Sequence, residues 1–286
     1  MAEYMVFTHV WVSIIETYLR YSSLKDYFMA TSTAASSLLS MVEHYREQGY
    51  LVRENLLPAD HIQRLRTRMQ EIAEGQVPDF PMSDVELEPD PGNGRPQAVR
   101  KINRCAENDA LFMTHAANDH ILDVVESLIG PDIKLYASQC FMKPPGGVAK
   151  PYHQDSAYFS IEPMDLVTCW TALDDVTLDN GCLWVITGSH LEGLVSHEKW
   201  HVGGREDKQV AEALLDRRRE APITMPAGSC SFHHSLLLHS SGANNTDKPR
   251  RGLAVHYMSA RCRWTNPEVS PPTYQLLRGC EHPGCV

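Results

Sequence analysis

The triplet His153-Gln154-Asp155 combines an imidazole and a carboxylate, two side chains that commonly bind divalent metals. In an extended segment, residues i and i+2 point to the same side, so His153 and Asp155 would present their donor atoms to one point. Two protein ligands do not make a firm metal site, and such triplets also occur by chance. A metal site here requires a third ligand from a distant segment.

His239 is the best candidate for this third ligand. It ends the run Ser-Phe-His-His-Ser-Leu-Leu-Leu-His, which is typical of a buried strand. Two histidines and one carboxylate on one face leave the remaining metal positions open, as in non-haem Fe(II) oxygenases. A structural zinc ion would instead prefer four protein ligands, usually including cysteines.

Other histidines offer alternatives. His190 follows a turn and could replace His239 as the third ligand, although loop histidines more often form only hydrogen bonds. One of His233 and His234 is expected to face the cavity without binding metal. His256 is expected either to form a polar wall of the pocket or to lie in the core with its hydrogen bonds satisfied.

Arg250 follows His239 after a turn-rich connection, and the next strand would bring it back beside the metal. Its guanidinium can hold a carboxylate through two parallel hydrogen bonds. Strand alternation gives Arg250 and Arg251 opposite faces. Arg250 shares its face with the small residues Gly252 and Ala254, which leaves volume for a ligand. The Arg251 face is bulkier and suits packing against helices, so we expect Arg250 to bind an anion.

Short β-type runs separated by turn residues must position these side chains. Many short strands with regular turns are typical of an antiparallel sandwich or barrel. Asp179-Asn180-Gly181 is a strong hairpin signal between two of the runs. A charged helix is predicted for residues 207–220. The predicted strands cover residues 133–142, 166–173, 182–187, 229–239 and 252–260.

Helical patterns precede the strands. Residues 58–74 and 108–129 have apolar residues at helical spacing, and residues 41–48 are also helical in pattern. Residues 75–97 contain many prolines and glycines and are predicted to form a long loop over a site. The expected fold class is mainly β with flanking helices, in which an N-terminal helical layer covers a C-terminal sandwich.

Five short motifs together resemble the phytanoyl-CoA dioxygenase family over roughly residues 41–262. The resemblance implies a double-stranded β-helix (a cupin-like jelly roll) with Fe(II), 2-oxoglutarate and O₂. It also implies that Lys101, Gln139, Trp170 and Ser241 lie in the co-substrate pocket with Arg250. The motifs are His153-Gln154-Asp155, Trp170-Thr171-Ala172-Leu173, Asn180-Gly181-Cys182-Leu183, Gly188-Ser189-His190, and His239-Ser240-Ser241-Gly242-Ala243-Asn244 followed by Arg250.

The domain prediction follows from the span of the resemblance. Residues 1–40 are expected to form a helical, dispensable extension, and residues 41–265 a single oxygenase domain with a jelly-roll core at about 133–262. Residues 266–286 are expected to form a C-terminal tail. This tail contains Cys280-Glu-His282-Pro-Gly-Cys285, which looks like a metal motif but is terminal and incomplete.

Composition restricts the partners and the compartment. The net charge of −10 and the pI of about 5.7 argue against nucleic acid as a partner. No segment has the long uncharged apolar run of a membrane span. The eight cysteines are scattered through a long chain, which predicts reduced thiols and a cytoplasmic location.

The predicted function is the hydroxylation or desaturation of an unactivated C–H bond in a small molecule, with conversion of 2-oxoglutarate and O₂ to succinate and CO₂. Halogenating relatives lack the ligand carboxylate, which is present here as Asp155. The family acts on acyl-CoA, osmolytes and natural products, so the substrate stays open. The alternatives are a cupin-like metal-binding protein without oxygenase activity and a jelly-roll enzyme with another divalent metal.

Overall fold

The computed structural model describes residues 39–88, 98–202 and 205–286. The chain divides into two compact units, residues 1–44 and residues 45–286. In the first unit the described residues, 39–44, are helical, and the prediction for the rest of this segment lies outside the described residues. In the part of the chain that is described, no helix is long and apolar enough to cross a membrane.

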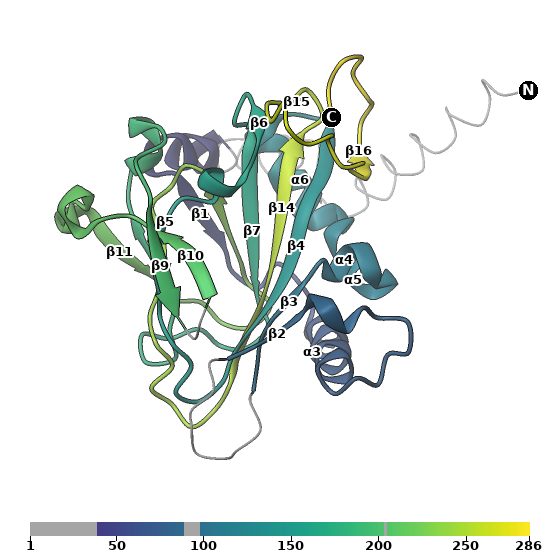
Figure 1. Cartoon of the computed structure of the whole chain (residues 1–286), viewed down its shortest axis with the longest axis vertical. Coiled ribbons are helices and arrows are strands. Elements are labelled where there is room, and N and C mark those ends of the chain that lie inside the picture. Colours follow the sequence, from purple (N-terminus) through teal and green to yellow (C-terminus); the bar gives the residue numbers. More distant parts are fainter. Residues whose placement is uncertain (1–38, 89–97, 203–204) are drawn as a thin grey trace, which may run out of the picture. The chain divides into compact units, whose positions relative to one another are not determined.

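The second unit is built on an antiparallel eight-stranded sheet (Figure 1). Its centre is the trio β7, β14 and β4, which pair over most of their lengths. The strands in spatial order are β1 (Tyr50–Arg53), β12 (Cys230–His234), β7 (Leu166–Ala172), β14 (Arg250–Ser259), β4 (Ile133–Lys143), β3 (Val99–Asn103) and β2 (Val85–Leu87), with β16 (Leu276–Arg278) also paired to β4.

A smaller sheet of four strands faces the larger one. Its order is β11 (Glu220–Ile223), β8 (Leu183–Ile186), β13 (His239–Ser241) and β5 (Lys150–His153). The chain passes from the larger sheet to the smaller one three times, after β4, β7 and β12. This alternation between two sheets is the topology of a double-stranded β-helix, so the predicted fold class is confirmed.

The predicted hairpin at Asp179-Asn180-Gly181 is wrong, because β7 and β8 belong to different sheets. The turn itself is present: Thr177 N donates to Asn180 Oδ1 at 2.9 Å, and Gly181 has a φ of +85°. Turn residues determine where the chain reverses locally, whereas the partner of each strand depends on which face it must bury. The predicted strand 229–239 is likewise two strands, β12 and β13, in different sheets.

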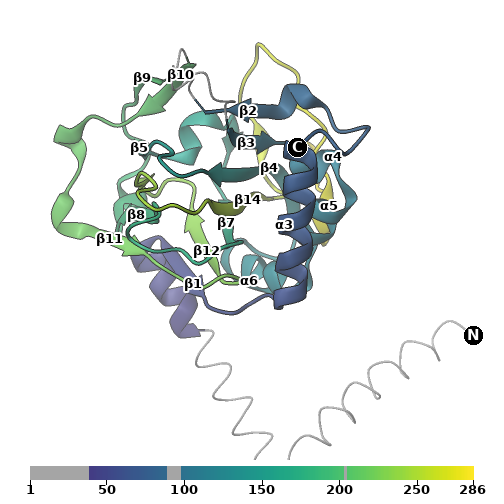
Figure 2. The same ribbon diagram turned by 90° about the horizontal axis from the view of Figure 1, so that it is seen from below.

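Four helices cover one face of the larger sheet (Figure 2). They are α3 (Ala59–Ala73), α4 (Cys105–Asn108), α5 (Ala110–Ala116) and α6 (Asp119–Ile129). The first matches its prediction, whereas the predicted stretch 108–129 is interrupted at Asp109 and Asn118. Each of these side chains accepts a hydrogen bond from the next helix, at Leu111 N (2.9 Å) and at His120 N (3.0 Å). Such capping explains why new helices begin there.

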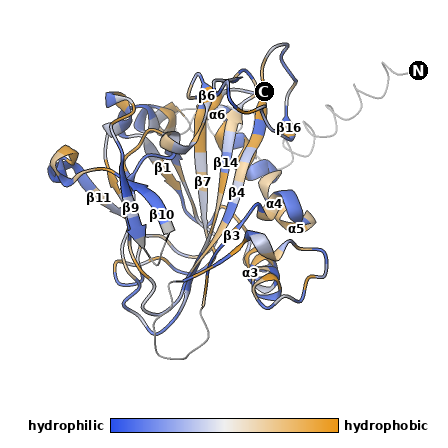
Figure 3. Ribbon diagram, viewed as in Figure 1, coloured by the Kyte–Doolittle hydropathy of each residue, from blue (hydrophilic) through white to orange (hydrophobic). Residues whose placement is uncertain are grey.

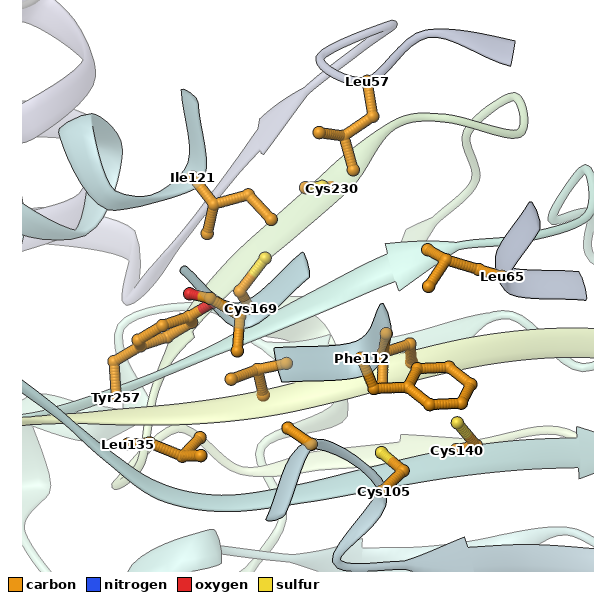
Figure 4. Packing of buried hydrophobic residues seen from close by; sticks show 14 of the residues in the cluster. Leu57, Leu65, Cys105, Phe112, Ile121, Leu135, Cys140, Cys169, Cys230 and Tyr257 are labelled. Atoms are coloured by element: carbon orange, nitrogen blue, oxygen red, sulfur yellow. The ribbon is translucent and has the colours of Figure 1, made fainter. Parts of the chain in front are cut away.

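The core lies between these helices and the larger sheet. Leu65 and Phe112 from the helices are fully buried and share one hydrophobic cluster with Cys140 and Tyr257 from the sheet (Figure 4). Burying each large apolar side chain contributes roughly 1.5–3 kcal/mol to folding. The helices therefore fix one face of β4, β7 and β14, and the opposite face is left for the cavity.

The predicted helix at 207–220 is also wrong. The segment contains the end of β10 (Arg205–Gln209), which pairs with β9 (Glu198–Val202), and two single-turn 3-10 helices, η4 (Glu212–Leu214) and η5 (Arg217–Arg219). Figure 3 shows hydrophilic colour along β9. Val210 and Leu215 of this segment pack in a cluster with residues of β5, β8 and the β13 side, whereas Leu214 is exposed, so its apolar residues do not form one helix face and its charges were a poor signal for a helix.

The end of the chain, which we expected to be a tail, contributes to the second unit. Strand β16 extends the larger sheet from the edge of β4, and Tyr274 is buried. A short pair formed by β6 (Ile161–Glu162) and β15 (Arg263–Trp264) precedes it. Residues 274–278 therefore pack as part of the sheet.

Candidate functional site

The three predicted metal ligands come together on the smaller sheet. His153 ends β5 and lies directly opposite His239, the first residue of β13. Gln154 is extended, with φ −117° and ψ 135°, so Asp155 points to the same side as His153, as predicted. The Nε2 atoms of His153 and His239 lie 3.8 and 3.6 Å from Asp155 Oδ1. Ligand atoms of all three residues lie within 4.8 Å of one another.

Backbone carbonyls fix the orientation of both imidazoles. His153 Nδ1 lies 2.9 Å from the carbonyl of Pro151, and His239 Nδ1 lies 2.9 Å from that of Leu237. Because a carbonyl only accepts hydrogen bonds, both Nδ1 atoms must carry the proton. The Nε2 lone pairs are then directed toward Asp155 Oδ1, which is the orientation that metal binding needs.

The second oxygen of Asp155 belongs to a different network. Thr168 on β7 donates its hydroxyl proton to Oδ2 at 2.7 Å, and His256 Nδ1 lies 2.8 Å from the same hydroxyl. Since Thr168 has only one proton, His256 must be the donor in the second contact. His233 Nε2 lies 3.6 Å from Oδ2. Asp155 therefore presents Oδ1 toward the imidazoles of His153 and His239, and Oδ2 toward Thr168, His256 and His233.

Protonation states favour a cation at this point. Burial alone would raise the pKa of Asp155, but the surrounding histidines, His239 first, hold this pKa well below its usual value. Burial lowers the pKa of His153 well below 6.5 and that of His239 to about 4. The centre thus contains a carboxylate and neutral imidazoles, which bind a metal without first losing protons.

The centre lies in a cavity of about 740 Å³ that is lined by residues of both sheets. Every predicted co-substrate residue lines it: Lys101, Gln139, Trp170, Ser241 and Arg250. Of the other histidines, His233 and His256 also line the cavity, whereas His234 and His190 do not. Thus one of the pair His233 and His234 faces the cavity, as predicted.

His190 takes part in local packing. Its Nε2 contacts the backbone carbonyl of Arg46 at 3.1 Å, and its ring lies 5.3 Å from that of His234. It does not belong to the group of converging ligand atoms. The geometry therefore favours His239 over His190 as the third ligand.

Arg250 is 3% exposed and points into the cavity, while Arg251 points away. Arg250 donates to the carbonyl of Gly181 at 2.7 Å, and no described residue accepts from its Nε. Arg251 instead forms a two-pronged ion pair with Asp174, with both contacts at 2.8 Å. The predicted alternation is present at these positions, and it leaves Arg250 with unused donors.

The volume expected beside Gly252 is filled. A Cβ atom at Gly252 would lie 2.0 Å from the ring of Trp170, so this position accepts only glycine. The same ring lies under the guanidinium of Arg250, at 5.1 Å from its centroid. The absence of a side chain at Gly252 therefore makes room for the Trp170 ring, and this ring stabilises Arg250 by a cation–π contact.

Lys143 is a cavity residue that the sequence analysis missed. It is the cross-strand neighbour of Arg250, is 9% exposed and donates to Ser241 Oγ at 3.0 Å and to the carbonyl of Gly242. In the described chain, neither Lys143 nor Arg250 forms an ion pair with a carboxylate, whereas Lys101 pairs with Glu86 at 3.2 Å. No signal in the sequence marks Lys143, because its proximity to Arg250 arises from strand pairing.

The protonation of Lys143 is sensitive to its surroundings. Burial first, and then Arg250 and Arg100, lower the pKa of Lys143 to about 7, while Glu88 and Cys182 act in the opposite direction. Two buried cations side by side are unfavourable unless an anion joins them. This end of the cavity is therefore suited to a carboxylate.

Two further segments, residues 75–97 and 191–221, also reach the cavity. The prediction that residues 75–97 form a loop is wrong in part, because β2 pairs with β3 at the edge of the larger sheet and a 3-10 turn precedes it. Val85, Glu86 and Glu88 of this segment line the cavity, and residues 89–97 lie outside the described residues. Glu206 and Asp207 come from the 191–221 segment. Asp207 forms an ion pair with Lys150 and accepts a hydrogen bond from Tyr158, which closes this wall.

Comparisons with known proteins agree with this geometry. Residues 45–252 match the family model described as phytanoyl-CoA dioxygenase (PhyH). The chain is 31% identical to the human peroxisomal phytanoyl-CoA dioxygenase, over 79% of this chain and 70% of that protein. It is 32% identical to a probable phytanoyl-CoA dioxygenase of Caenorhabditis elegans, over 82% and 81%. The solved structure of a non-heme monooxygenase, ThoJ, has a TM-score of 0.70 at 23% identity and 86% coverage of both chains.

Alanine substitution of His153, Asp155 or His239 should abolish Fe(II) binding and turnover, because each removes one of the three predicted protein ligands. His190→Ala should retain iron binding. Anaerobic iron titration of the four variants measures this, with circular dichroism to confirm folding. Iron binding by His239→Ala together with its loss in His190→Ala would reverse the assignment.

Thr168→Val should weaken Fe(II) binding by about 10-fold or more, because Asp155 Oδ2 loses its closest donor. Thr171→Val is the matched control: it removes a buried hydroxyl from the same strand, but one that contacts His115 and Cys230. Iron titration should separate the two variants. Equal iron affinities in both would show that the shell around Oδ2 does not hold the carboxylate.

Proposed function

Because the chain belongs to the phytanoyl-CoA dioxygenase family of Fe(II)- and 2-oxoglutarate-dependent oxygenases, we propose that His153, Asp155 and His239 bind its iron and that Arg250 binds 2-oxoglutarate. One observation carries this proposal. A buried group of two neutral imidazoles and one carboxylate shares a cavity with a guanidinium that has unused donors. The first element fits Fe(II), and the second fits the carboxylate of a co-substrate.

Iron, when bound with O₂ and 2-oxoglutarate, supplies the oxidising power for C–H hydroxylation, with succinate and CO₂ as co-products. The protein orients the metal ligands and limits the access of water. The Nδ1–H bonds of His153 and His239 prevent rotation of the two rings, and Thr168 holds the carboxylate of Asp155. The walls of the cavity keep bulk water away from the reacting atoms.

The far carboxylate of 2-oxoglutarate would meet the pair of buried cations. Arg250 offers its unused Nε–H, and Lys143 offers a second positive charge from the neighbouring strand. Ser241 accepts a hydrogen bond from Lys143, so its own hydroxyl proton is free to donate to the ligand. The family resemblance implied Lys101 as the second cation of the 2-oxoglutarate pocket, but Lys101 is paired with Glu86. We propose that Lys143, the cross-strand neighbour of Arg250, takes this role instead.

We propose an acyl-CoA thioester as the substrate class, ahead of osmolytes and other natural products. The relatives with 31–32% identity are named phytanoyl-CoA dioxygenases. The remaining wall of the cavity supports this choice: Phe141, Phe159 and Leu183 offer apolar surface, and Arg100 and Lys150 offer positive charge that a phosphate would share with their carboxylate partners, Glu88 and Asp207. An acyl chain needs the former, and the phosphates of a CoA group need the latter.

We propose that the protein is cytoplasmic. All eight cysteines are free, which supports the predicted cytoplasmic location, since reduced thiols persist there. The human relative is named peroxisomal. Fractionation of cells that express the full chain would distinguish the two compartments.

The proposed function is tested by succinate release from anaerobically iron-loaded enzyme with a panel of acyl-CoA thioesters, free acids and polar osmolytes. The iron-dependent succinate yield should rise with at least one thioester and match the amount of hydroxylated product found by mass spectrometry. The binding rival, a cupin-like protein without activity, would bind iron but release no succinate with any compound. Turnover of an osmolyte alone would exclude the acyl-CoA proposal.

Arg250→Ala should raise the KM for 2-oxoglutarate at least about tenfold, because a buried charge-assisted contact contributes roughly 1.5–3 kcal/mol. Arg251→Ala should leave this KM nearly unchanged, because its side chain is paired with Asp174 on the opposite face. Succinate formation against 2-oxoglutarate concentration measures both, and iron affinity should stay constant. Equal effects of the two substitutions would contradict the assignment.

Lys143 should make 2-oxoglutarate binding depend on pH. With a pKa of about 7, its ammonium is charged at pH 6 and largely neutral at pH 8, so the KM should rise by about tenfold between them. In Lys143→Arg, which stays charged, this rise should disappear while the KM stays low. In Lys143→Met the KM should be high at both values. The measurement uses saturating iron, and an unchanged pH profile in Lys143→Arg would exclude this role.

A further inference from the structure

A second group of metal-binding side chains lies at the start of β4. Strand β16 pairs with Ile133 and Lys134 and brings the end of the chain over Asp132. Gly279 has a φ of +80°, and a Cβ there would lie 2.4 Å from Asp132 Oδ1. Glycine at this position therefore permits the close approach that places the following residues on the carboxylate.

The donor atoms of three residues converge there. Cys280 Sγ lies 3.4 Å from Asp132 Oδ1, His282 Nε2 lies 2.7 Å from Oδ2, and the sulfur and nitrogen are 4.0 Å apart. Tetrahedral zinc bonds of normal length place sulfur, nitrogen and oxygen ligands roughly 3.4–3.6 Å from one another. The sulfur–oxygen contact lies in that range, whereas the nitrogen–oxygen contact is about 0.7 Å too short and the sulfur–nitrogen contact about 0.4 Å too long, so shifts of up to about 0.7 Å in these separations would satisfy it.

We propose that Asp132, Cys280 and His282 form a second metal site, which binds Zn(II) and fastens the C-terminal segment to β4. The donor set decides the ion. Thiolate and imidazole are preferred ligands of zinc, whereas Mg²⁺ and Ca²⁺ require oxygen ligands. Three protein ligands leave one tetrahedral position for water. The site includes neither the iron ligands nor any residue of the cavity, so it does not rest on the proposed function.

Electrostatics around the site favour a cation. The hydrogen bonds from His282 and Cys280 lower the pKa of Asp132 to about 2, so the carboxylate is ionised at neutral pH. Asp132 in turn raises the pKa of the Cys280 thiol. A thiol is a weak hydrogen-bond donor, so its contact with the Asp132 carboxylate contributes little stability. A cation bound between them would stabilise both the Cys280 thiolate and the carboxylate. Zinc binding should release the thiol proton, so affinity should rise with pH.

Three other charged groups face this cluster. Arg261 contacts Asp132 Oδ2 at 3.3 Å, but its side chain is 64% exposed and can turn into solvent. Glu281 and Lys134 neutralise each other in an ion pair at 2.5 Å. Arg261 is therefore the cation that zinc must displace, and its exposure keeps the cost of that displacement low.

Cobalt titration of the full-length protein tests the site, because thiolate–Co(II) bonds give a near-ultraviolet charge-transfer band. The iron centre has no cysteine, so only the proposed site produces this band. It should disappear on addition of Zn(II) and persist in His239→Ala, in which it should saturate at one equivalent because the iron centre has lost a ligand. It should also grow with pH, and Zn(II) should raise the melting temperature.

Cys280→Ser should abolish the band, and His282→Gln should weaken cobalt affinity at least tenfold. Cys285→Ser is the matched control, because Cys285 Sγ contacts the carbonyl of Arg261 and lies outside the converging group. It should keep the band and the zinc-dependent rise in melting temperature. A band that needs millimolar cobalt, that survives Cys280→Ser or that depends on Cys285 would overturn the proposal.

Discussion

The burial of one carboxylate, Asp155, is the constraint on which the rest of the site depends. At 8% exposure, an ionised carboxylate is stable only if donors or cations replace water on both of its oxygens. The fold meets this demand directly only at Oδ2, whereas the neutral imidazoles around Oδ1 offer lone pairs, so Oδ1 requires a bound cation. His153 and His239 face Oδ1 from the smaller sheet, and Thr168 donates to Oδ2 from the larger one. The fold thus separates a metal-facing side from a supporting side.

Alternate side chains of strand β14 point to the hydrophobic core and to the cavity. Leu253 and Val255 lie in the core under the helices, while Arg250 and Ala254 face the cavity. Because the helices immobilise one face, the side chains of the other face have defined positions. The cation Arg250 therefore has a fixed direction, and Trp170 supports it from the neighbouring strand.

Local sequence patterns predicted the orientation of individual side chains, but they did not predict which strands pair with each other. The extended His153–Asp155 geometry and the Arg250 alternation follow from strand periodicity, which involves only neighbouring residues. Which strands lie side by side depends on the whole fold. That is why the hairpin prediction at Asp179-Asn180-Gly181 failed, and why Lys143 was missed although it is the cross-strand neighbour of Arg250. The family resemblance supplied Lys101, Gln139, Trp170 and Ser241, which no periodicity identifies.

The charged groups of the cavity fit a ligand that carries a different chemical group at each end. At one end, a metal held by His153, Asp155 and His239 would keep positions open for a bidentate oxygen donor. At the other, Arg250 and Lys143 are buried without a described carboxylate partner, and Ser241 has a proton to donate. A dicarboxylate with a keto group at one end neutralises both, which supports 2-oxoglutarate over a monocarboxylate. Its binding would also offset the repulsion between the two cations, which contributes to affinity for the co-substrate.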